Sequence, residues 1–284
     1  MASKIYLLSS EIAPFADQYH LAQFVNRVPT YLKEKDHDIR LIMPKYGFIS
    51  SRKYVLREVI RLRDIEAKWR TEVITGNVRS AFVPETKVQV YFLDLPAYFE
   101  DVSHLLYKAK NGRPLKDNVE RFGLFSKISL RTLEKLFWQP EIIIANDWAS
   151  AFSVVLQKQL FSREEFFASS KTIFMLHSME ELLRFTEDTL LDAGIDPDSF
   201  DMEITEETRL IDVAAHVADE VVLVNSPEMN MEKSAFDDPQ LNSVLKDREN
   251  EPHILSWADD SEEEWADLTE KFETILNETA GIEE

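Results

Sequence analysis

The chain has 284 residues, no cysteine and a formal net charge of −20. The lack of cysteine excludes disulfides and thiolate zinc sites, and the acid excess disfavours nucleic acid and anionic membranes, which are bound through Lys and Arg. No segment approaches the ~20 consecutive apolar residues of a membrane span and no leader sequence is evident, so we expect a cytoplasmic protein.

Short apolar runs alternate with segments of helical periodicity along residues 1–230. Strands are predicted at 5–8, 38–43, 55–62, 71–75, 88–93, 141–145, 171–176 and 220–224, and helices at 21–35, 118–137, 150–160, 207–218 and 261–276. The runs at 142–144 and 221–224 are continuous and apolar, which is typical of parallel strands covered on both faces. The prediction is an α/β fold, with a doubly wound, Rossmann-like and mostly parallel sheet in one domain over residues 1–240.

The stretch from 55 to 93 has a different pattern, because apolar and charged side chains alternate in it. This alternation predicts an antiparallel hairpin or an insertion at the sheet edge. Thr75-Gly76-Asn77 is the predicted turn of that hairpin.

After Ser226 the alternation of strands and helices weakens, and residues 237–239 and 246–252 resemble a polar linker. Ser261 and Glu264 then predict a capping box, and residues 256–284 contain eleven acids against one base. We expect residues 241–284 to form a linker and an acidic amphipathic helix that docks on its own domain, with docking on a partner as the alternative. The apolar face of this helix consists of Trp265, Leu268, Phe272, Ile275 and Leu276.

Residues 4–24, KIYLLSSEIAPFADQYHLAQF, are arranged like a nucleotide-binding unit, with a buried strand, a loop and a helix. Such loops usually carry glycines, because backbone N–H groups must approach a phosphate closely. The loop at 16–20 has no glycine and no lysine, and it contains Asp17. The whole chain has only six glycines, well below the typical ~7% of residues. The pattern predicts the strand, loop and helix of a phosphate-binding site without the glycines and the lysine that bind a phosphate.

Six sequence blocks resemble the N-terminal domain of bacterial glycogen and starch synthases, the family-five glycosyltransferases. The blocks are SSEIAPFA, HDIRLIMPKYG, KDNVERFGLFSKISL, PEIIIANDWASAF, KTIFMLHS and HVADEVVLVNSP, and they occur in the family's order over roughly residues 1–230. The resemblance implies the N-terminal domain of a GT-B fold. It also implies a relation to retaining glucosyl transfer from ADP-glucose to an α-1,4-glucan, with no cofactor and no metal.

Asp147 and His177 each follow a predicted parallel strand, at the edge where doubly wound sheets bind ligands. A carboxylate and an imidazole at this edge suit hydrogen bonds to sugar hydroxyls or the stabilisation of developing positive charge. The resemblance implies that they match the family's acceptor- and donor-sugar contacts, so they are the candidate catalytic residues. Taken alone, His177 is better explained as a histidine whose hydrogen bonds are satisfied at a strand end.

The candidate substrate-binding residues are Glu11, Asp117, Asn118, Arg121 and Trp148. The resemblance places Glu11 and Asn118 in the same cleft. Asp117 suits the N-cap of the helix that begins at 118, Arg121 suits a contact with a carboxylate, and Trp148 offers a sugar a stacking face. Without the resemblance, Asp117 is most simply a cap and Trp148 a core residue.

The chain departs from the family at the phosphate loop and in length. The family's Lys-x-Gly-Gly-Leu is Asp-Gln-Tyr-His-Leu at 17–21, and an acid in place of the lysine repels a diphosphate. Asn146 replaces a histidine, and Ser178 replaces an asparagine. The family's second domain, which holds most of the nucleotide, has no counterpart in these 284 residues. In this interpretation residues 257–276 correspond to the family's last helix, which crosses back from the second domain to pack on the N-terminal domain.

Three functions remain open at this point. In the first, the chain takes part in ADP-glucose-dependent glucan synthesis, as a subunit or a short synthase. The changed loop argues against catalysis by this chain alone. Alternatively, it is a non-catalytic module that binds α-glucan or a partner synthase, or a regulatory protein with a vestigial cleft, and self-association is also open. Four aromatic residues suit sugar stacking around the cleft: Phe15, Tyr19, Tyr46 and Trp148.

Overall fold

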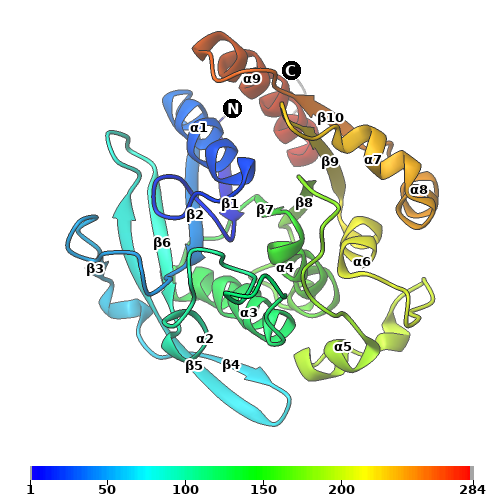
Figure 1. Ribbon diagram of the computed structural model, residues 1–284, viewed down its shortest axis with the longest axis horizontal. Helices are drawn as coiled ribbons and strands as arrows, with labels where there is room; N and C mark the ends of the chain where they lie inside the picture. Colours follow the sequence, from blue (N-terminus) through cyan, green and yellow to red (C-terminus); the bar gives the residue numbers. More distant parts are fainter. Residues whose placement is uncertain (1, 282–284) are drawn as a thin grey trace.

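The apolar runs of the sequence form the inner strands of one large sheet in the computed structural model, which describes residues 2–281 (Figure 1). The strands predicted at 141–145 and 220–224 are observed at 142–146 and 220–225, and their side chains are almost entirely buried, so both faces of the sheet are covered there. The strands are β1 (Lys4–Leu8), β2 (Asp38–Pro44), β3 (Arg57–Glu58), β4 (Ile65–Trp69), β5 (Glu72–Phe82), β6 (Gln89–Asp94), β7 (Ile142–Asn146), β8 (Lys171–Leu176), β9 (Glu220–Asn225) and β10 (His253–Ser256).

The strand order is β10-β9-β8-β7-β1-β2-β6-β5-β3, and β4 pairs with β5. Neighbours from β10 to β6 are parallel, whereas β5 runs antiparallel to β6, β3 and β4. The chain builds outward from β1 to β2 and β6, and then crosses to β7 on the other side of β1. The topological switch point therefore lies between the carboxyl ends of β1 and β7, where doubly wound sheets bind ligands.

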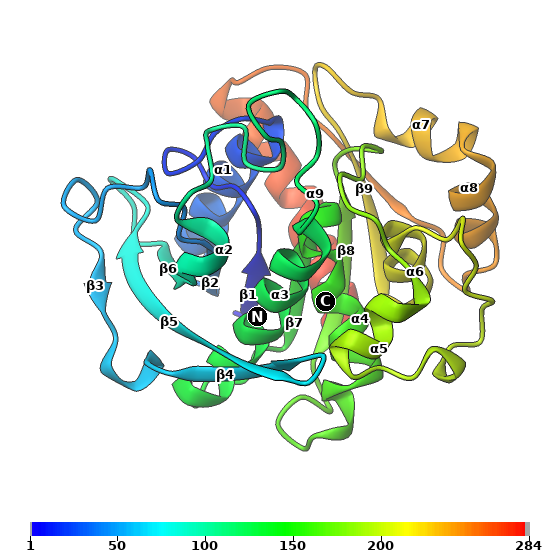
Figure 2. The same ribbon diagram turned by 60° about the horizontal axis from the view of Figure 1, so that its bottom comes forward.

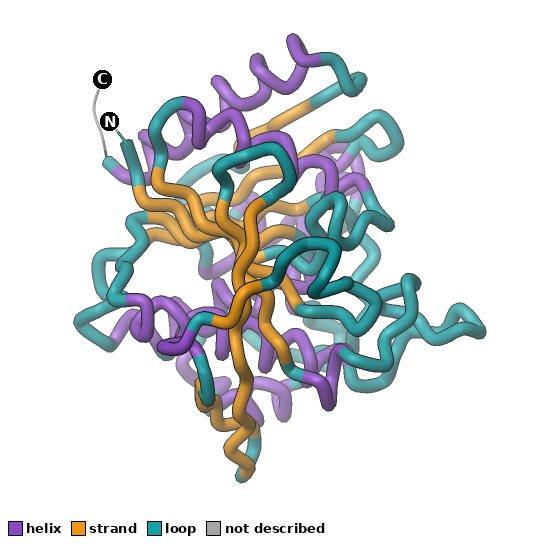
Figure 3. The backbone as a smooth tube through the Cα atoms, turned by 90° about the vertical axis from the view of Figure 1, so that its left-hand side faces the viewer, coloured by secondary structure: helices purple, strands orange, loops and turns teal. Residues whose placement is uncertain are grey.

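Helices cover both faces of this sheet (Figures 2 and 3). α3, α4 and α6 pack beside one another on one face, and α1 packs against α9 on the other. This arrangement confirms the predicted doubly wound α/β class. No helix between residues 2 and 281 is both long and apolar enough to span a bilayer. The helices are α1 (His20–Glu34), α2 (Pro96–Phe99), α3 (Asn118–Leu136), α4 (Trp148–Gln159), α5 (Glu187–Ala193), α6 (Leu210–Val217), α7 (Met231–Asp237), α8 (Pro239–Lys246) and α9 (Glu262–Ala280).

The antiparallel hairpin exists, but the predicted turn at 75–77 is wrong. Residues 70–71 form the turn between β4 and β5, and Arg70 there has a φ of 54°. Gly76 lies inside β5 opposite Ile65, where an added Cβ would lie 3.0 Å from the Leu93 side chain. Its small size therefore serves close packing rather than a turn. The predicted strand at 55–62 is also mostly wrong, because only Arg57–Glu58 pair and residues 60–62 form a 3₁₀ turn.

Residues 247–252 of the predicted polar linker form neither helix nor strand, but regular structure lies on both sides of them. The Asp238 carboxylate accepts a hydrogen bond from the Leu241 N–H at 2.9 Å and caps α8, whose first residue is Pro239. β10 then adds a parallel edge strand beside β9. Position 240, the predicted domain boundary, falls inside α8. The division of the chain into 1–240 and 241–284 stays a prediction.

The acidic C-terminal helix forms as α9, one residue after Ser261. The Ser261 hydroxyl accepts from the Glu264 N–H at 3.3 Å, but the Glu264 carboxylate bonds to Ala258, so only half of the predicted capping box forms. α9 packs against α1 and β10. The acids at 283 and 284 lie outside the described residues. The whole predicted apolar face is buried: Trp265, Leu268, Phe272, Ile275 and Leu276.

Candidate functional site

A cavity of about 190 Å³ opens at the switch point between β1 and β7. Its walls come from the loop after β1, the start of α1, the segment before α3, and the ends of β7, β8 and β9 with their loops. Four of the seven predicted site residues lie together here, and the other three do not. The lining residues are Glu11, Tyr19, His20, Leu21, Tyr107, Asp147, Trp148, His177, Ser178, Glu180, Leu182, Val224, Ser226, Glu228 and Met229.

Glu11 is fully buried in the wall beside the start of α1. One carboxylate oxygen accepts the backbone N–H groups of Gln18 at 2.7 Å and Tyr19 at 3.2 Å, and the other accepts the Tyr107 hydroxyl at 2.5 Å. Burial raises the pKa of Glu11 to about 7, while these three hydrogen bonds oppose the rise. An internal carboxylate therefore occupies amides that a phosphate loop would offer to its ligand.

Asp147 precedes α4 with a φ of 60° and a ψ of 177°, a region that is nearly restricted to glycine. Its carboxylate accepts the backbone N–H groups of His177 at 3.2 Å and Ser178 at 3.1 Å, and the Ser178 hydroxyl at 2.9 Å. Burial raises the pKa of Asp147 to about 6 against the effect of these bonds. Asp147 thus ties the end of β7 to the end of β8 and holds His177 in place.

The His177 ring packs edge-on against Phe24 of α1 with centroids 5.0 Å apart, and its Nε2 lies 3.3 Å from the Asn146 side-chain oxygen. The Asn146 amide nitrogen donates to the Leu8 carbonyl, so the oxygen faces His177 and Nε2 carries the proton. Burial, with a smaller effect of His20, lowers the pKa of His177 to about 3. His177 is therefore neutral near pH 7, with Nδ1 as its acceptor.

Aromatic side chains form the remaining wall of the cavity. Trp148 is only 3% exposed and packs edge-on against Tyr107 with centroids 4.9 Å apart. The Tyr107 ring in turn lies 5.8 Å from the ring of Tyr19, which is 41% exposed. Tyr46 is fully buried, so the prediction that it offers a sugar a ring face is wrong. Tyr19 is therefore the ring of this wall most open to a ligand.

The three predicted residues at the start of α3 lie outside the cavity. Asp117 is exposed and makes no side-chain bond to the helix amides, so its predicted role as N-cap is wrong. Arg121 is buried, donates to the backbone carbonyls of Tyr98 and Leu106, and has its Nε 3.7 Å from the Asp117 carboxylate, a contact of the predicted kind. Asn118 donates to the carbonyls of Tyr107 at 2.9 Å and Leu182 at 2.5 Å. Asn118 thereby supports two wall segments without lining the cavity.

The cavity is acidic. Four carboxyl groups line it, and no lysine or arginine does so among the described residues. Glu180 pairs with Lys108 at 2.8 Å, and Glu228 pairs with His20 at 2.7 Å. A diphosphate would therefore meet mainly like charge here. Sequence reasoning missed Tyr107, Glu180 and Glu228, because they lie in irregular segments that carry no periodic signal.

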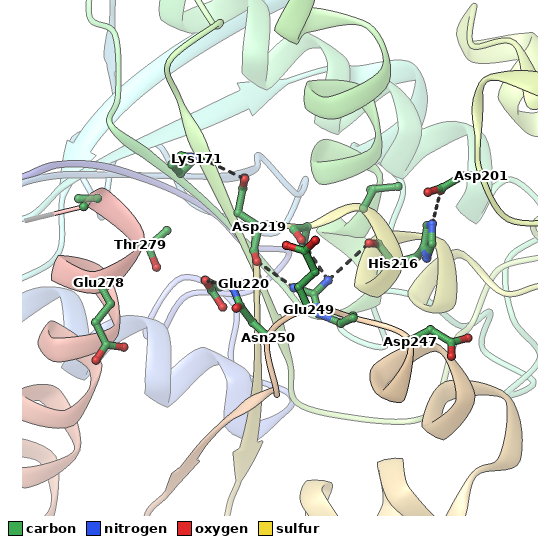
Figure 4. A pocket seen from close by; sticks show the side chains of 15 residues that line it. Lys171, Asp201, His216, Asp219, Glu220, Asp247, Glu249, Asn250, Glu278 and Thr279 are labelled. Atoms are coloured by element: carbon green, nitrogen blue, oxygen red, sulfur yellow. Dashed lines mark hydrogen bonds and ion pairs between the residues drawn. The ribbon is translucent and has the colours of Figure 1, made fainter.

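A larger cavity of about 810 Å³ lies at the opposite edge of the sheet, by the amino ends of β8 and β9 (Figure 4). Some of its charged side chains are paired: Asp219 lies 2.6 Å from Lys158, and His216 lies 2.5 Å from Asp201. None of the predicted site residues lies there. Within residues 2–281 no group of three or more acidic or histidine side chains is placed to hold a metal ion.

A doubly wound sheet with a polar cavity at its switch point defines an α/β domain of the Rossmann-like class. Residues 4–247 match the family model of the starch synthase catalytic domain, and the chain therefore belongs to this family. The match confirms the resemblance seen in the six sequence blocks.

The chain is similar to curated glycogen synthases. It is 36% identical to that of Pelodictyon phaeoclathratiforme over 176 residues, which are 62% of this chain and 36% of the relative. It is 31% identical to that of Chlorobaculum tepidum over 241 residues, which are 84% of this chain and 48% of the relative. The chain thus spans less than half the length of these relatives.

The fold is also similar to a solved structure, the catalytic domain of starch synthase IV from Arabidopsis thaliana bound to ADP and acarbose. The TM-score is 0.71 at 19% sequence identity, and the match covers 90% of this chain and 51% of that one. At this identity the likeness is one of fold.

Proposed function

We propose that the chain acts in storage α-glucan metabolism as the glucan-handling domain of a glycogen-synthase-type transferase. The cavity at the switch point receives a terminal glucosyl unit, and the 284-residue chain alone does not hold the diphosphate of ADP-glucose. The observation that carries the proposal is the Glu11 carboxylate bound to the N–H groups of Gln18 and Tyr19.

The loop chemistry supports the exclusion of a diphosphate. A phosphate that replaced the Glu11 carboxylate at these two amides would leave one oxygen of a buried carboxyl group without its donors, which is energetically costly. Asp17 stands where the family has a lysine, and the cavity has four carboxyl groups. Both features oppose binding of an anion.

The same cavity suits an uncharged sugar. Neutral His177 offers an acceptor nitrogen to a hydroxyl group, and Asp147 positions His177 through its backbone N–H. Tyr19 adds an exposed ring beside these polar groups. In this proposal Asp147 and His177 are the groups nearest to the sugar, and Trp148 shapes the wall.

In this proposal, ADP-glucose binds only when basic groups for its diphosphate are supplied from elsewhere. The source is a further domain, a partner synthase or a second copy of the chain. The starch synthase IV domain was solved with ADP and acarbose, which supports a nucleotide and a saccharide as the ligands to test. The alternative of a purely regulatory protein has no observation in its favour.

Affinity electrophoresis in native gels that contain glycogen tests the proposal. We expect glycogen to retard the parent chain and to retard the Asp147→Asn/His177→Ala variant much less. A matched control is Asp201→Asn/His216→Ala, which changes an aspartate and a histidine at the other cavity and should be retarded like the parent. Equal migration of the parent with and without glycogen would refute glucan binding.

A further inference from the structure

The loop between β9 and α7 forms one wall of the cavity at the switch point. Ser226, Glu228 and Met229 of this loop line the cavity. The backbone N–H of Ser226 donates to the Met229 carbonyl at 2.9 Å, and the N–H of Met229 donates to the Ser226 carbonyl at 3.2 Å. Residues 226–229 therefore form a small turn whose backbone hydrogen bonds are internal. Such a turn can move as a unit without breaking these bonds.

Both ends of the turn are anchored. The Asn225 amide nitrogen donates to the Ser256 hydroxyl at 3.0 Å, and the Asn225 amide oxygen accepts the Glu232 N–H at 2.9 Å. On the other side, the side chain of Met231 is fully buried. The part of the chain that can swing is thus confined to the few residues between these two anchors.

One side-chain contact joins the turn to the opposite wall of the cavity. The Glu228 carboxylate lies 2.7 Å from Nε2 of His20, the first residue of α1. The His20 ring packs edge-on against Trp257 with centroids 5.8 Å apart, which holds the imidazole beside the turn. The His20 and Glu228 side chains are 34% and 75% exposed, and exposed pairs contribute little stability. A contact of this kind closes the wall but breaks readily.

The neighbouring loop after β8 is held more firmly. The Glu181 carboxylate accepts the backbone N–H groups of Leu210 at 3.2 Å and Ile211 at 2.9 Å. The Leu182 carbonyl accepts the Asn118 side chain at 2.5 Å. Among the described residues, the turn at 226–229 has no comparable buried contact with another wall of the cavity. Of these two loops, the turn is therefore the one able to move.

The size of the cavity gives such a movement a purpose. Its volume of about 190 Å³ is below the ~300–1,000 Å³ that is usual for small-molecule sites. We propose that residues 226–229 form a flap, which opens to admit a ligand to this cavity, and that the His20–Glu228 contact is its latch. A loop of this kind governs how fast a ligand enters and leaves. The inference rests on the proposed function only for the identity of the ligand.

Hydrogen–deuterium exchange, measured by mass spectrometry, tests the latch without any ligand. We expect His20→Ala and Glu228→Ala each to speed amide exchange at 226–229 about two- to fivefold, as for the loss of an exposed pair. His216→Ala breaks a comparable exposed pair with Asp201 and should leave exchange at 226–229 unchanged. Parent-like exchange rates at 226–229 in both latch variants would overturn the latch.

Cross-linking tests whether the flap must open. The chain has no cysteine, so His20→Cys/Glu228→Cys carries the only two thiols, and a short bis-maleimide joins the flap to α1. We expect glycogen to retard this variant in native gels after treatment with N-ethylmaleimide, which leaves the thiols unjoined, but not after cross-linking. Equal retardation after both treatments would overturn the gate. A parent that glycogen does not retard would refute the proposed function instead, and the exchange rates alone would then decide on the flap.

Discussion

Asp147 combines backbone strain with a supporting hydrogen-bond network. A side chain at its φ of 60° and ψ of 177° costs about 1–3 kcal/mol, whereas glycine adopts this region freely. Asp147→Gly and Asp147→Ala both remove the carboxylate, so their difference isolates the strain. We expect Asp147→Gly to be more stable than Asp147→Ala by about 1 kcal/mol in urea unfolding. Equal stability, or a more stable alanine variant, would contradict a strained backbone.

Glu11 predicts a pH dependence of stability. Burial raises its pKa from the ordinary 4.5 to about 7, so the folded chain holds the proton more tightly than the unfolded chain. The free energy of unfolding therefore falls as the pH rises from 4.5 to about 7, by ~3 kcal/mol from this group. Glu11→Gln removes this contribution, and urea unfolding at pH 5 and pH 8 should show a smaller difference for the variant. The same difference in both proteins would contradict the raised pKa.

At the residue scale, the positions of Asp147 and His177 could be predicted because strand ends follow from apolar runs. The contact of Arg121 with the carboxylate of Asp117, four residues earlier, could also be predicted. The role of Asn118 could not, because its partners are backbone carbonyls of irregular segments. Tyr107 was missed for the same reason. It reaches Glu11 from 96 positions away in the chain, and no local pattern records that contact.

At the element scale, Gly123 sets the approach of β4 to α3. A Cβ at this position would lie 2.3 Å from the ring of Trp69. Helix propensity favours Gly123→Ala by ~1 kcal/mol, but the steric conflict should outweigh it and give a net loss of about 1–3 kcal/mol. Thermal unfolding measures the effect. Trp69→Phe in the same chain should recover part of the loss, and a stabilised single variant would refute the tight contact.

α9 supports the site through α1. Phe272 is fully buried, and its ring lies 6.4 Å from that of Phe24, which packs against His177. Phe272→Ala should lower the free energy of unfolding by about 3–5 kcal/mol, as for other buried aromatic residues. Lys271→Ala is the control, because this side chain is exposed and forms a surface pair with Asp267. If the two variants had similar stability in urea, α9 would not stabilise the fold. Unchanged stability of a chain that ends at Asp247 would lead to the same conclusion.

The long helices were predictable, whereas the longest strand, β5, and the short elements α8 and β10 were not. α1, α3, α4 and α9 carry apolar faces over several turns, and each lies within a few residues of its predicted range. α8 and β10 are short, and they gain stability from contacts with α6 and β9 that no local pattern reveals. Gly76 shows the same limit, because its packing neighbours are distant in the chain.

For the whole molecule, the fold and the charge of the cavity lead to different expectations about the ligand. The fold is that of the starch synthase catalytic domain family, and the curated relatives are more than twice as long as the matched part of this chain. The acidic cavity and the Glu11-occupied loop favour a neutral glucan over a nucleotide diphosphate. The proposal that residues 257–276 correspond to a returning C-terminal helix accords with the packing of α9 on α1.

A transfer assay tests this account most directly. The purified chain is incubated with radiolabelled ADP-glucose and glycogen, and Asp147→Asn/His177→Ala controls for contaminating synthase. We expect no label in glycogen above the level of that variant, because the chain alone holds no diphosphate. Label that enters glycogen only with the parent would contradict the account and would show that these 284 residues suffice for catalysis.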